Sequence, residues 1–314
     1  MAITAKQVQE LRAKTNVGMM ECKKALVEAE GDMDKAIDIL RERGVAAAAK
    51  KSSRIAADGL IMCYTDEDKK IGAIVEVNSE TDFVASNDVF KTLVLIVAKT
   101  VAYNDPADIE ALMDMTAYGD TRTVRELFQE AILKIGENLQ ARRFLRYEGN
   151  VATYIHGGGS VGVVVKFDVS DEIAATEAFK EMGKNVAMQI CALSPAYLDR
   201  ASVPADVIEH EKGIMIVQLQ EDPKMKGKPA NILDKIVVGK LDKFYSENCL
   251  LEQAYVKDGD IDVQKYIASV AKTLGSDIKV VSYVRYAKGE GIEKKHEDLA
   301  EEIAKQLQQH SGNA

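Results

Sequence analysis

The chain has no tryptophan among its 314 residues, and it has only five prolines and four cysteines. Cys22, Cys63, Cys191 and Cys249 lie far apart and form no Cys-x-x-Cys pair. This spacing argues against a zinc site and against a disulfide framework, and it fits a reducing cytosol. Three of the four lie in apolar runs, where we expect inert core thiols.

Long apolar segments and metal-ligand patterns are also missing. No apolar run approaches the roughly 18 residues of a membrane-spanning helix, and the first residues contain no apolar signal core. There is no Walker A sequence, and no metal-ligand spacing is found among the histidines His156, His210, His296 and His310. We therefore expect a cytoplasmic protein that spans no membrane and holds no cofactor and no metal.

Positive charge is scarce outside the first segment. The formal net charge is −9, whereas residues 1–54 hold 11 Lys and Arg against 8 Asp and Glu, which leaves −12 for the remainder. So acidic a chain is a poor ligand for nucleic acid, and we expect no direct nucleic-acid partner. The basic first segment suits an acidic protein surface, although a solvated helix face explains any single lysine more simply.

The first segment has the pattern of a small helical bundle. Residues 1–44 show the apolar spacing of three short helices, with Gly31 and Gly44 placed where helices end in a left-handed residue. Such a bundle has a thin core and little stability alone. Residues 45–56 are predicted to form a helical or flexible linker, and we assign residues 1–54 to the bundle and its linker.

The rest of the chain contains an internal repeat, which appears when Gly59 is aligned with Gly149. The strand-like run at residues 71–77 then meets residues 161–167, and the helical patterns that follow match after one deletion. The third strand of each unit is predicted at residues 144–147 and 283–286. Each unit is therefore strand, strand, helix and a long connection to a third strand, which makes the fold class α+β.

Residues 55–148 are assigned to the first repeat, and residues 149–201 with 248–290 to the second. Residues 202–247 are predicted to form an inserted antiparallel helical hairpin. Its second helix has an apolar stripe of Leu233, Ile236, Val237, Leu241 and Phe244. The predicted facing residues are Val207, Ile208, Ile214 and Val217.

Two further helical signals lie outside the repeat alignment. Asp105-Pro106 is predicted to open a helix with proline in its first position, and Thr123 with Glu126 forms a capping box. A final helical module is assigned to residues 291–314 from the apolar positions Leu299, Ile303 and Leu307.

The two repeats agree at apolar positions and disagree in the loop before the helix. The first has Thr81-Asp82-Phe83-Val84 before a helix that Asn87 is placed to cap, whereas residues 169–173 of the second contain no aromatic residue. The fold therefore does not require Phe83 in a polar loop. We expect this loop to carry function, the simpler alternative being that Phe83 folds back onto its own core.

Residues 156–162, His-Gly-Gly-Gly-Ser-Val-Gly, match three catalytic motifs by accident: the dinucleotide fingerprint, the nucleophile elbow and the His-Gly-Gly-Gly of esterase oxyanion holes. A dinucleotide fingerprint and a nucleophile elbow each need a strand that leads into a helix. Both flanks here are strand-like, and the first repeat has a charged turn at the equivalent place. We therefore predict a hairpin turn, and a hydrolase that uses Ser160 and His156 is disfavoured.

Three segments together resemble the signatures of the bacterial elongation factor Ts family. They are Thr15-Asn16-Val17-Gly18-Met19-Met20-Glu21-Cys22-Lys23-Lys24-Ala25-Leu26, Glu80-Thr81-Asp82-Phe83-Val84-Ala85 and Tyr154-Ile155-His156-Gly157. The resemblance covers nearly the whole chain. The connection near residues 105–121 and the triple-glycine turn depart from it, because relatives are often shorter there.

The resemblance implies a non-enzymatic guanine-nucleotide exchange factor whose partner is elongation factor Tu. It also implies a ubiquitin-associated-like N-terminal bundle, two related core subdomains, a helical-hairpin insert that could pair two copies of the chain, and a C-terminal helical module. The implied wedge near the Mg²⁺ and phosphate site of the GTPase consists of Thr81, Asp82, Phe83 and Val84. The other implied contacts are Val17, Gly18, Met19, Met20, Lys23 and Lys24 in the bundle, and Tyr154 and His156 in the second subdomain.

The main alternative is a ubiquitin-associated-type binding scaffold without exchange activity. In that case residues 1–54 would hold the activity and Phe83 would be dispensable. The two hypotheses therefore differ in what removal of the Phe83 ring does.

Overall fold

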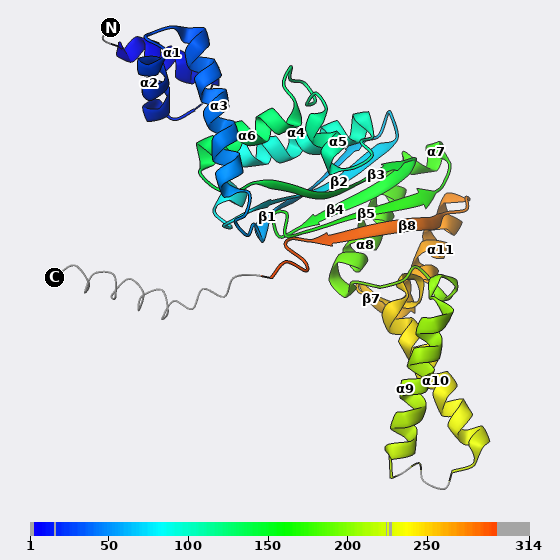
Figure 1. Ribbon diagram of the computed structural model, residues 1–314. Helices are drawn as coiled ribbons and strands as arrows, with labels where there is room; N and C mark the ends of the chain where they lie inside the picture. The colour runs from blue at the N-terminus through cyan, green and yellow to red at the C-terminus, as the bar shows by residue number, and fades with distance from the viewer. Residues whose placement is uncertain (1–2, 16, 224, 226–227, 294–314) are drawn as a thin grey trace, which may run out of the picture.

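The computed structural model describes residues 3–15, 17–223, 225 and 228–293. Two three-stranded antiparallel sheets form its centre, with a helical bundle at one end and a helical hairpin at the other (Figure 1). The predicted α+β class with two related subdomains is confirmed. No helix within the described residues is long and apolar enough to cross a membrane.

The N-terminal bundle consists of α1 (Ala5–Thr15), α2 (Met19–Glu28) and α3 (Met33–Lys51). Its core contains Leu11, Cys22, Leu26 and Leu40, all buried. The prediction that Gly44 ends a helix is wrong, because α3 continues to Lys51. A Cβ at Gly44 would lie 3.2 Å from the backbone oxygen of Gln129. The glycine thus allows α3 to approach a helix of the first repeat.

The first repeat forms a sheet of order β1-β2-β3 that is covered by helices. Its elements are β1 (Asp58–Asp66), β2 (Ile71–Ser79), the 3₁₀ turn η1 (Val84–Ser86), α4 (Asp88–Asn104), α5 (Ile109–Asp114), α6 (Val124–Ile135) and β3 (Gln140–Glu148). Every residue of β2 is buried. Its odd-numbered side chains pack against the helices, which leaves the even-numbered ones to face the second sheet.

The second repeat forms a sheet of order β4-β5-β8. Its elements are β4 (Asn150–His156), β5 (Val161–Asp168), α7 (Asp171–Ala174), α8 (Glu177–Leu193), η2 (Arg200–Ser202), η3 (Leu250–Glu252), β6 (Ala254–Tyr255), β7 (Asp258–Asp262), α11 (Val263–Leu274) and β8 (Lys279–Ala287). Residues 157–160 are the predicted hairpin turn between β4 and β5.

The predicted repeat extends to the irregular features of the two sheets. The central strand of each sheet has a register shift, between Glu76 and Val77 in β2 and between Lys166 and Phe167 in β5. These positions correspond at the predicted offset. The helix caps also correspond, as shown by the N-caps Asn87 and Thr176 and the left-handed C-caps Asp105 and Ser194.

The two sheets contact each other reciprocally. A Cβ at Gly72 in β2 would lie 2.8 Å from Val151 of β4, and one at Gly162 in β5 would lie 2.5 Å from Ile61 of β1. Because Gly72 aligns with Gly162 and Ile61 with Val151, each repeat offers the same small residue and the same apolar residue to the other. Such a contact has the self-complementary form of a twofold interface.

Asp105-Pro106 does not open a helix, so that prediction is wrong. Asp105 instead ends α4 in the left-handed conformation with φ 48°, and α5 begins at Ile109 after the N-cap Asp108. The capping box of Thr123 and Glu126 at the start of α6 is confirmed.

The inserted hairpin consists of α9 (Ala205–Glu221) and α10 (Ala230–Asn248). The stripe predicted on α10 is buried or half-buried. The prediction for α9 is partly wrong, because Ile214 and Val217 are exposed, whereas Met215 and Leu219 are buried. Residues 294–314, which include most of the predicted C-terminal module, lie outside the described residues.

Candidate functional site

The loop between β2 and α4 presents a large aromatic ring to solvent. The side chain of Phe83 is 84% exposed, whereas that of the next residue, Val84, is 5% exposed and lies in the core of the first repeat. The alternative in which Phe83 folds back onto its own core is therefore wrong. Because Val84 is buried in the core directly after Phe83, it anchors the backbone that carries the exposed ring.

The backbone beneath Phe83 is ordered by short-range hydrogen bonds. The amides of Ala85, Ser86 and Asn87 donate to the carbonyls of Asp82, Phe83 and Val84, at 3.1, 3.2 and 2.9 Å. The Asn87 side chain then accepts from the amide of Val89 and caps α4, as the sequence predicts. The loop is thus a helical turn that leads directly into a long helix.

Asp82 is exposed beside Phe83 and is not neutralised by a neighbour. Within the ranges that the structure describes, its carboxylate has no hydrogen-bond or ion-pair partner. Thr81 differs, because its amide and hydroxyl both donate to the carboxylate of Glu137, at 3.0 and 2.6 Å. The loop therefore presents the exposed Asp82 carboxylate and the exposed Phe83 ring next to Thr81, which is held by hydrogen bonds.

The same loop is joined to the end of the N-terminal bundle's last helix. Glu80 accepts from the amide of Asn138 at 2.6 Å and pairs with Arg54 at 3.3 Å. The Asn138 side chain donates to the carbonyl of Arg54 at 2.8 Å. Arg54 follows α3 closely, so the loop and the bundle share one connection.

The signature residues of the bundle divide into support and surface. Val17 is 3% exposed and packs in the bundle core, so it supports the surface instead of forming it. Met19 and Met20 are 52% and 67% exposed. Gly18, Lys23 and Lys24 are also exposed. An exposed apolar pair beside lysines is a suitable protein-binding surface.

Sequence reasoning did not include Val27 in this surface. Val27 is 58% exposed and lines a shallow depression together with Met20, Lys23 and Lys24. The signal was available, because Met20 and Val27 are seven residues apart and therefore lie on one face of α2. That face is opposite to the buried stripe of Cys22, Ala25 and Leu26.

Tyr154 and His156 lie on β4 beside the glycine turn. The Tyr154 hydroxyl is 3.2 Å from Nδ1 of His156, and the imidazole is exposed. Gly159 has φ 105°, and a Cβ there would lie 2.1 Å from Leu60 of β1. Gly159 is thus needed for close packing between the repeats.

The geometry also disfavours a nucleophilic role for Ser160. Its hydroxyl donates to the backbone carbonyls of His156 and Gly157, at 3.1 and 3.2 Å. No contact joins it to the imidazole of His156 among the described residues. A nucleophile needs a base within hydrogen-bond reach, so this turn does not have the arrangement of a hydrolase site.

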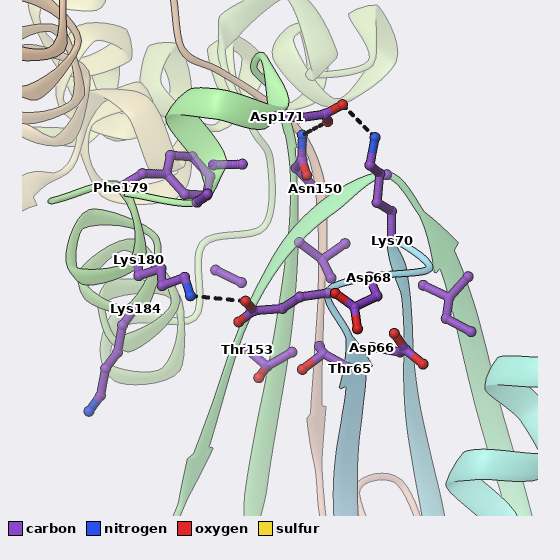
Figure 2. A pocket seen from close by; sticks show the side chains of 17 residues that line it. Thr65, Asp66, Asp68, Lys70, Asn150, Thr153, Asp171, Phe179, Lys180 and Lys184 are labelled. Carbon is purple, nitrogen blue, oxygen red and sulfur yellow. Dashed lines mark hydrogen bonds and ion pairs between the residues drawn. The ribbon is translucent and has the colours of Figure 1, made fainter. Parts of the chain in front are cut away.

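A groove of about 420 Å³ lies where the repeats meet at the β1–β2 turn (Figure 2). Lys70 pairs with Asp171 at 2.5 Å, and Lys180 with Glu67 at 2.9 Å, so two ion pairs cross the groove. The hydrogen bond from Lys70 lowers the pKa of Asp171. These charges neutralise each other in pairs, which is typical of a seam between subdomains.

Two of the predicted sites lie at the other end of the first sheet. Asp58 pairs with Ser79 at that end, whereas Asp66 pairs with Ile71 at the groove. The Phe83 loop follows Ser79, and the turn after His156 contacts β1 through a hydrogen bond from the amide of Ile61 to the carbonyl of Gly159 at 2.8 Å. The fold thus brings the loop and the β4 turn to one end, where the bundle is also attached.

Comparisons with known proteins identify the family to which the chain is similar. A family model described as elongation factor Ts matches residues 80–290. Elongation factor Ts of Clostridium kluyveri is 47% identical over 310 residues, which cover 98% of this chain and 99% of that protein. Elongation factor Ts of Clostridium botulinum is 45% identical over 311 residues, with the same coverage.

Exposed apolar groups beside buried supports are typical of a protein that acts by binding another protein. The matches specify which one. The chain belongs to the elongation factor Ts family, and its function is therefore in translation elongation.

Proposed function

We propose that this chain is a guanine-nucleotide exchange factor that binds elongation factor Tu with GDP and promotes release of the GDP. The observation that supports this most directly is the exposed, well-supported ring of Phe83 beside the exposed carboxylate of Asp82. In this proposal the chain acts in the cytoplasm, performs no covalent chemistry, needs no cofactor, and contacts neither nucleic acid nor membrane.

The proposed mechanism is differential binding. A factor that binds the nucleotide-free GTPase better than the GDP form must weaken GDP binding by the same factor. Burial of the Phe83 ring is worth about 1.5–3 kcal/mol, which corresponds to about tenfold to a hundredfold. The wedge thus accounts for part of a large acceleration, and the Asp82 carboxylate adds repulsion toward bound phosphate or competes for the Mg²⁺ environment.

A wider contact is needed to hold the wedge in place. The exposed Met19, Met20 and Val27 with the neighbouring lysines form one candidate surface, and Tyr154 with His156 forms another. The three surfaces are connected through α3 and β1, so a partner that touches all of them contacts elements that are already joined to one another.

We also propose that the hairpin pairs two copies of the chain. Residues 213–220 of α9 contain no charged residue, and Ile216, Val217 and Val238 of the hairpin are 45%, 53% and 58% exposed. A helix that is apolar on all sides is normally covered. Light scattering of the parent and of Val217→Asp tests this, because pairing predicts a dimer mass that the variant lowers to that of one chain.

The experiment that tests exchange measures release of a fluorescent GDP analogue from elongation factor Tu. We expect rapid release with the parent and at least about tenfold slower release with Phe83→Ala, the lower bound of the burial energy. Leu193→Ala is the matched control, because Leu193 is also an exposed apolar residue, at 47%, and lies on α8.

The possible outcomes separate the hypotheses. Rapid release with both parent and Phe83→Ala would retain exchange and place its energy in the wider surface. No acceleration by the parent would favour the binding scaffold, in which the bundle alone recognises a partner. The hydrolase alternative would require a hydrolytic activity of this chain that Ser160→Ala abolishes.

A further inference from the structure

The Phe83 tip is held from both sides, and the two restraints come from different parts of the chain. On the C-terminal side, Val84 is buried and Asn87 caps α4. On the N-terminal side, Thr81 makes two hydrogen bonds to Glu137, which precedes β3 and is 56 residues away in sequence. Asp82 and Phe83 lie between these anchors and carry the exposed groups.

Within the described chain, the side chain of Thr81 bonds only to Glu137, and its backbone carbonyl accepts from the Ser79 hydroxyl at 2.8 Å. The two carboxylate oxygens of Glu137 accept separately, Oε2 from the amide and Oε1 from the hydroxyl. The bond from the amide fixes the position of the Thr81 backbone, and the bond from the hydroxyl fixes the rotation of its side chain. Hydrogen bonds to a charged acceptor are also stronger than neutral ones.

The next residue pair extends the restraint to the bundle. Glu80 is held by the amide of Asn138, which directly follows Glu137, and by Arg54. Asn138 is 4% exposed and its side chain reaches the carbonyl of Arg54. One short segment, 137–138, therefore fastens the loop and the end of the α3 connection together.

The second repeat lacks this device. Its equivalent loop folds into α7, whose first residue Asp171 bonds to Lys70 and Asn150 at the groove. That loop carries no exposed aromatic ring and thus has no tip to hold. The hydrogen bonds between Thr81 and Glu137 therefore occur in the repeat that has the exposed ring, and the fold does not require them in both repeats.

An ordered tip acts on an already bound partner more readily than a mobile one, because a mobile loop loses conformational entropy when it is fixed against that partner. We propose that Glu137 is a positioning residue that, through Thr81, holds the Asp82-Phe83 tip in the geometry needed to act on a partner. This inference rests on the proposed exchange function for its consequence, but the restraint itself is a property of the free chain.

The restraint can be measured without a partner. Because the chain has no tryptophan, Phe83→Trp places a single reporter at the tip. Time-resolved fluorescence anisotropy should show a slowly rotating indole in this variant and a larger fast component after the further change Glu137→Ala. Glu148→Ala is the matched control, since Glu148 lies at the other end of β3 and pairs with Arg146 at 2.7 Å.

The consequence is measured as GDP release at saturating factor. Glu137→Ala should lower the maximal rate about fivefold, the factor that corresponds to roughly one net hydrogen bond, and leave the half-saturating concentration nearly unchanged. Glu137→Gln keeps one acceptor for Thr81 and should be intermediate. In a Phe83→Ala background, Glu137→Ala should cause no further loss, because its effect passes through the ring.

Two results would overturn the inference. An unchanged anisotropy decay in Glu137→Ala would show that Thr81 does not restrain the tip. A loss of rate that adds to that of Phe83→Ala would show that Glu137 acts elsewhere. If the parent failed to accelerate GDP release from elongation factor Tu, the proposed function would be wrong. The anisotropy experiment would still show whether Glu137 restrains the tip.

Discussion

In the first repeat, the chain leaves the central strand through an exposed turn with Phe83 at its tip, and in the second it leaves through α7, which has no such ring. The strands, register shifts and helix caps around these loops correspond. The same scaffold thus tolerates both loops. The comparison teaches that the matching cores specify the fold. The loop before the helix is not specified by them, and only the loop of the first repeat presents an exposed aromatic ring.

The largest expected effect tests whether the two cores are equivalent. Phe90 and Phe179 occupy matching positions and are 0% and 3% exposed. Replacement of either by alanine should lower the free energy of unfolding by about 3–5 kcal/mol, because a large cavity is left in a packed core. Urea denaturation followed by circular dichroism measures both variants. A nearly neutral result for one would show that the repeats do not share equal cores.

The second prediction concerns a position at which the repeats differ. Glu76 is buried and accepts hydrogen bonds from the Gly289 amide at 2.8 Å and from Arg143 at 2.5 Å. Lys166 holds the matching place and is only half-buried. Glu76→Gln should cost about 3 kcal/mol, since it removes the buried charged acceptor of the partly buried Arg143 guanidinium, which keeps only the more exposed Glu290 at 3.1 Å. Lys166→Gln should change stability by less than about 0.5 kcal/mol.

The pH dependence gives an independent check on Glu76. Burial raises its pKa, but the bonds from Gly289, Asn78 and Arg143 outweigh burial and hold the pKa below its ordinary value of 4.5. The carboxylate therefore stabilises the fold fully above that value, and the contribution is lost as the pH falls through the lowered pKa. The stability difference between parent and Glu76→Gln should narrow below pH 4.5. A difference that stayed constant would contradict an ionised Glu76.

These contrasts show what the sequence could and could not predict. Local signals were sufficient for the repeat, the Asn87 cap and the capping box at Thr123, because each depends on residues close in sequence. Gly44 was misread as a helix end, since its reason is a contact with Gln129 in another helix. Such contacts leave no mark on local periodicity.

The candidate site divides in the same way. The unusual Phe83 was visible from the second copy of the loop. Its restraint by Glu137 was not predicted, because the pair is separated by 56 residues and an exposed-looking glutamate has many possible roles. Val17 was assigned to a surface because a signature does not distinguish a contact from its buried support.

The third prediction tests the reciprocal contact between the sheets. Gly72→Ala and Gly162→Ala should each cost about 1–3 kcal/mol, because the added methyl overpacks the seam. The contacts to be displaced are Val151 at 2.8 Å and Ile61 at 2.5 Å. Adding Val151→Ala to Gly72→Ala should recover part of the loss in a double-mutant cycle. Strictly additive losses would contradict the contact.

The smallest expected effect concerns the matching helix ends. Asp105 and Ser194 end α4 and α8 with φ 48° and 47°, a conformation that disfavours any side chain. Glycine avoids that strain but loses more entropy on folding, so Ser194→Gly should raise the free energy of unfolding by about 0.5 kcal/mol. Asp105 lies 3.6 Å from the half-buried Arg146, and loss of this pair should make the gain from Asp105→Gly smaller. Thermal unfolding of both variants measures the difference. A larger gain at Asp105 than at Ser194 would show that its pairing with Arg146 contributes nothing to stability.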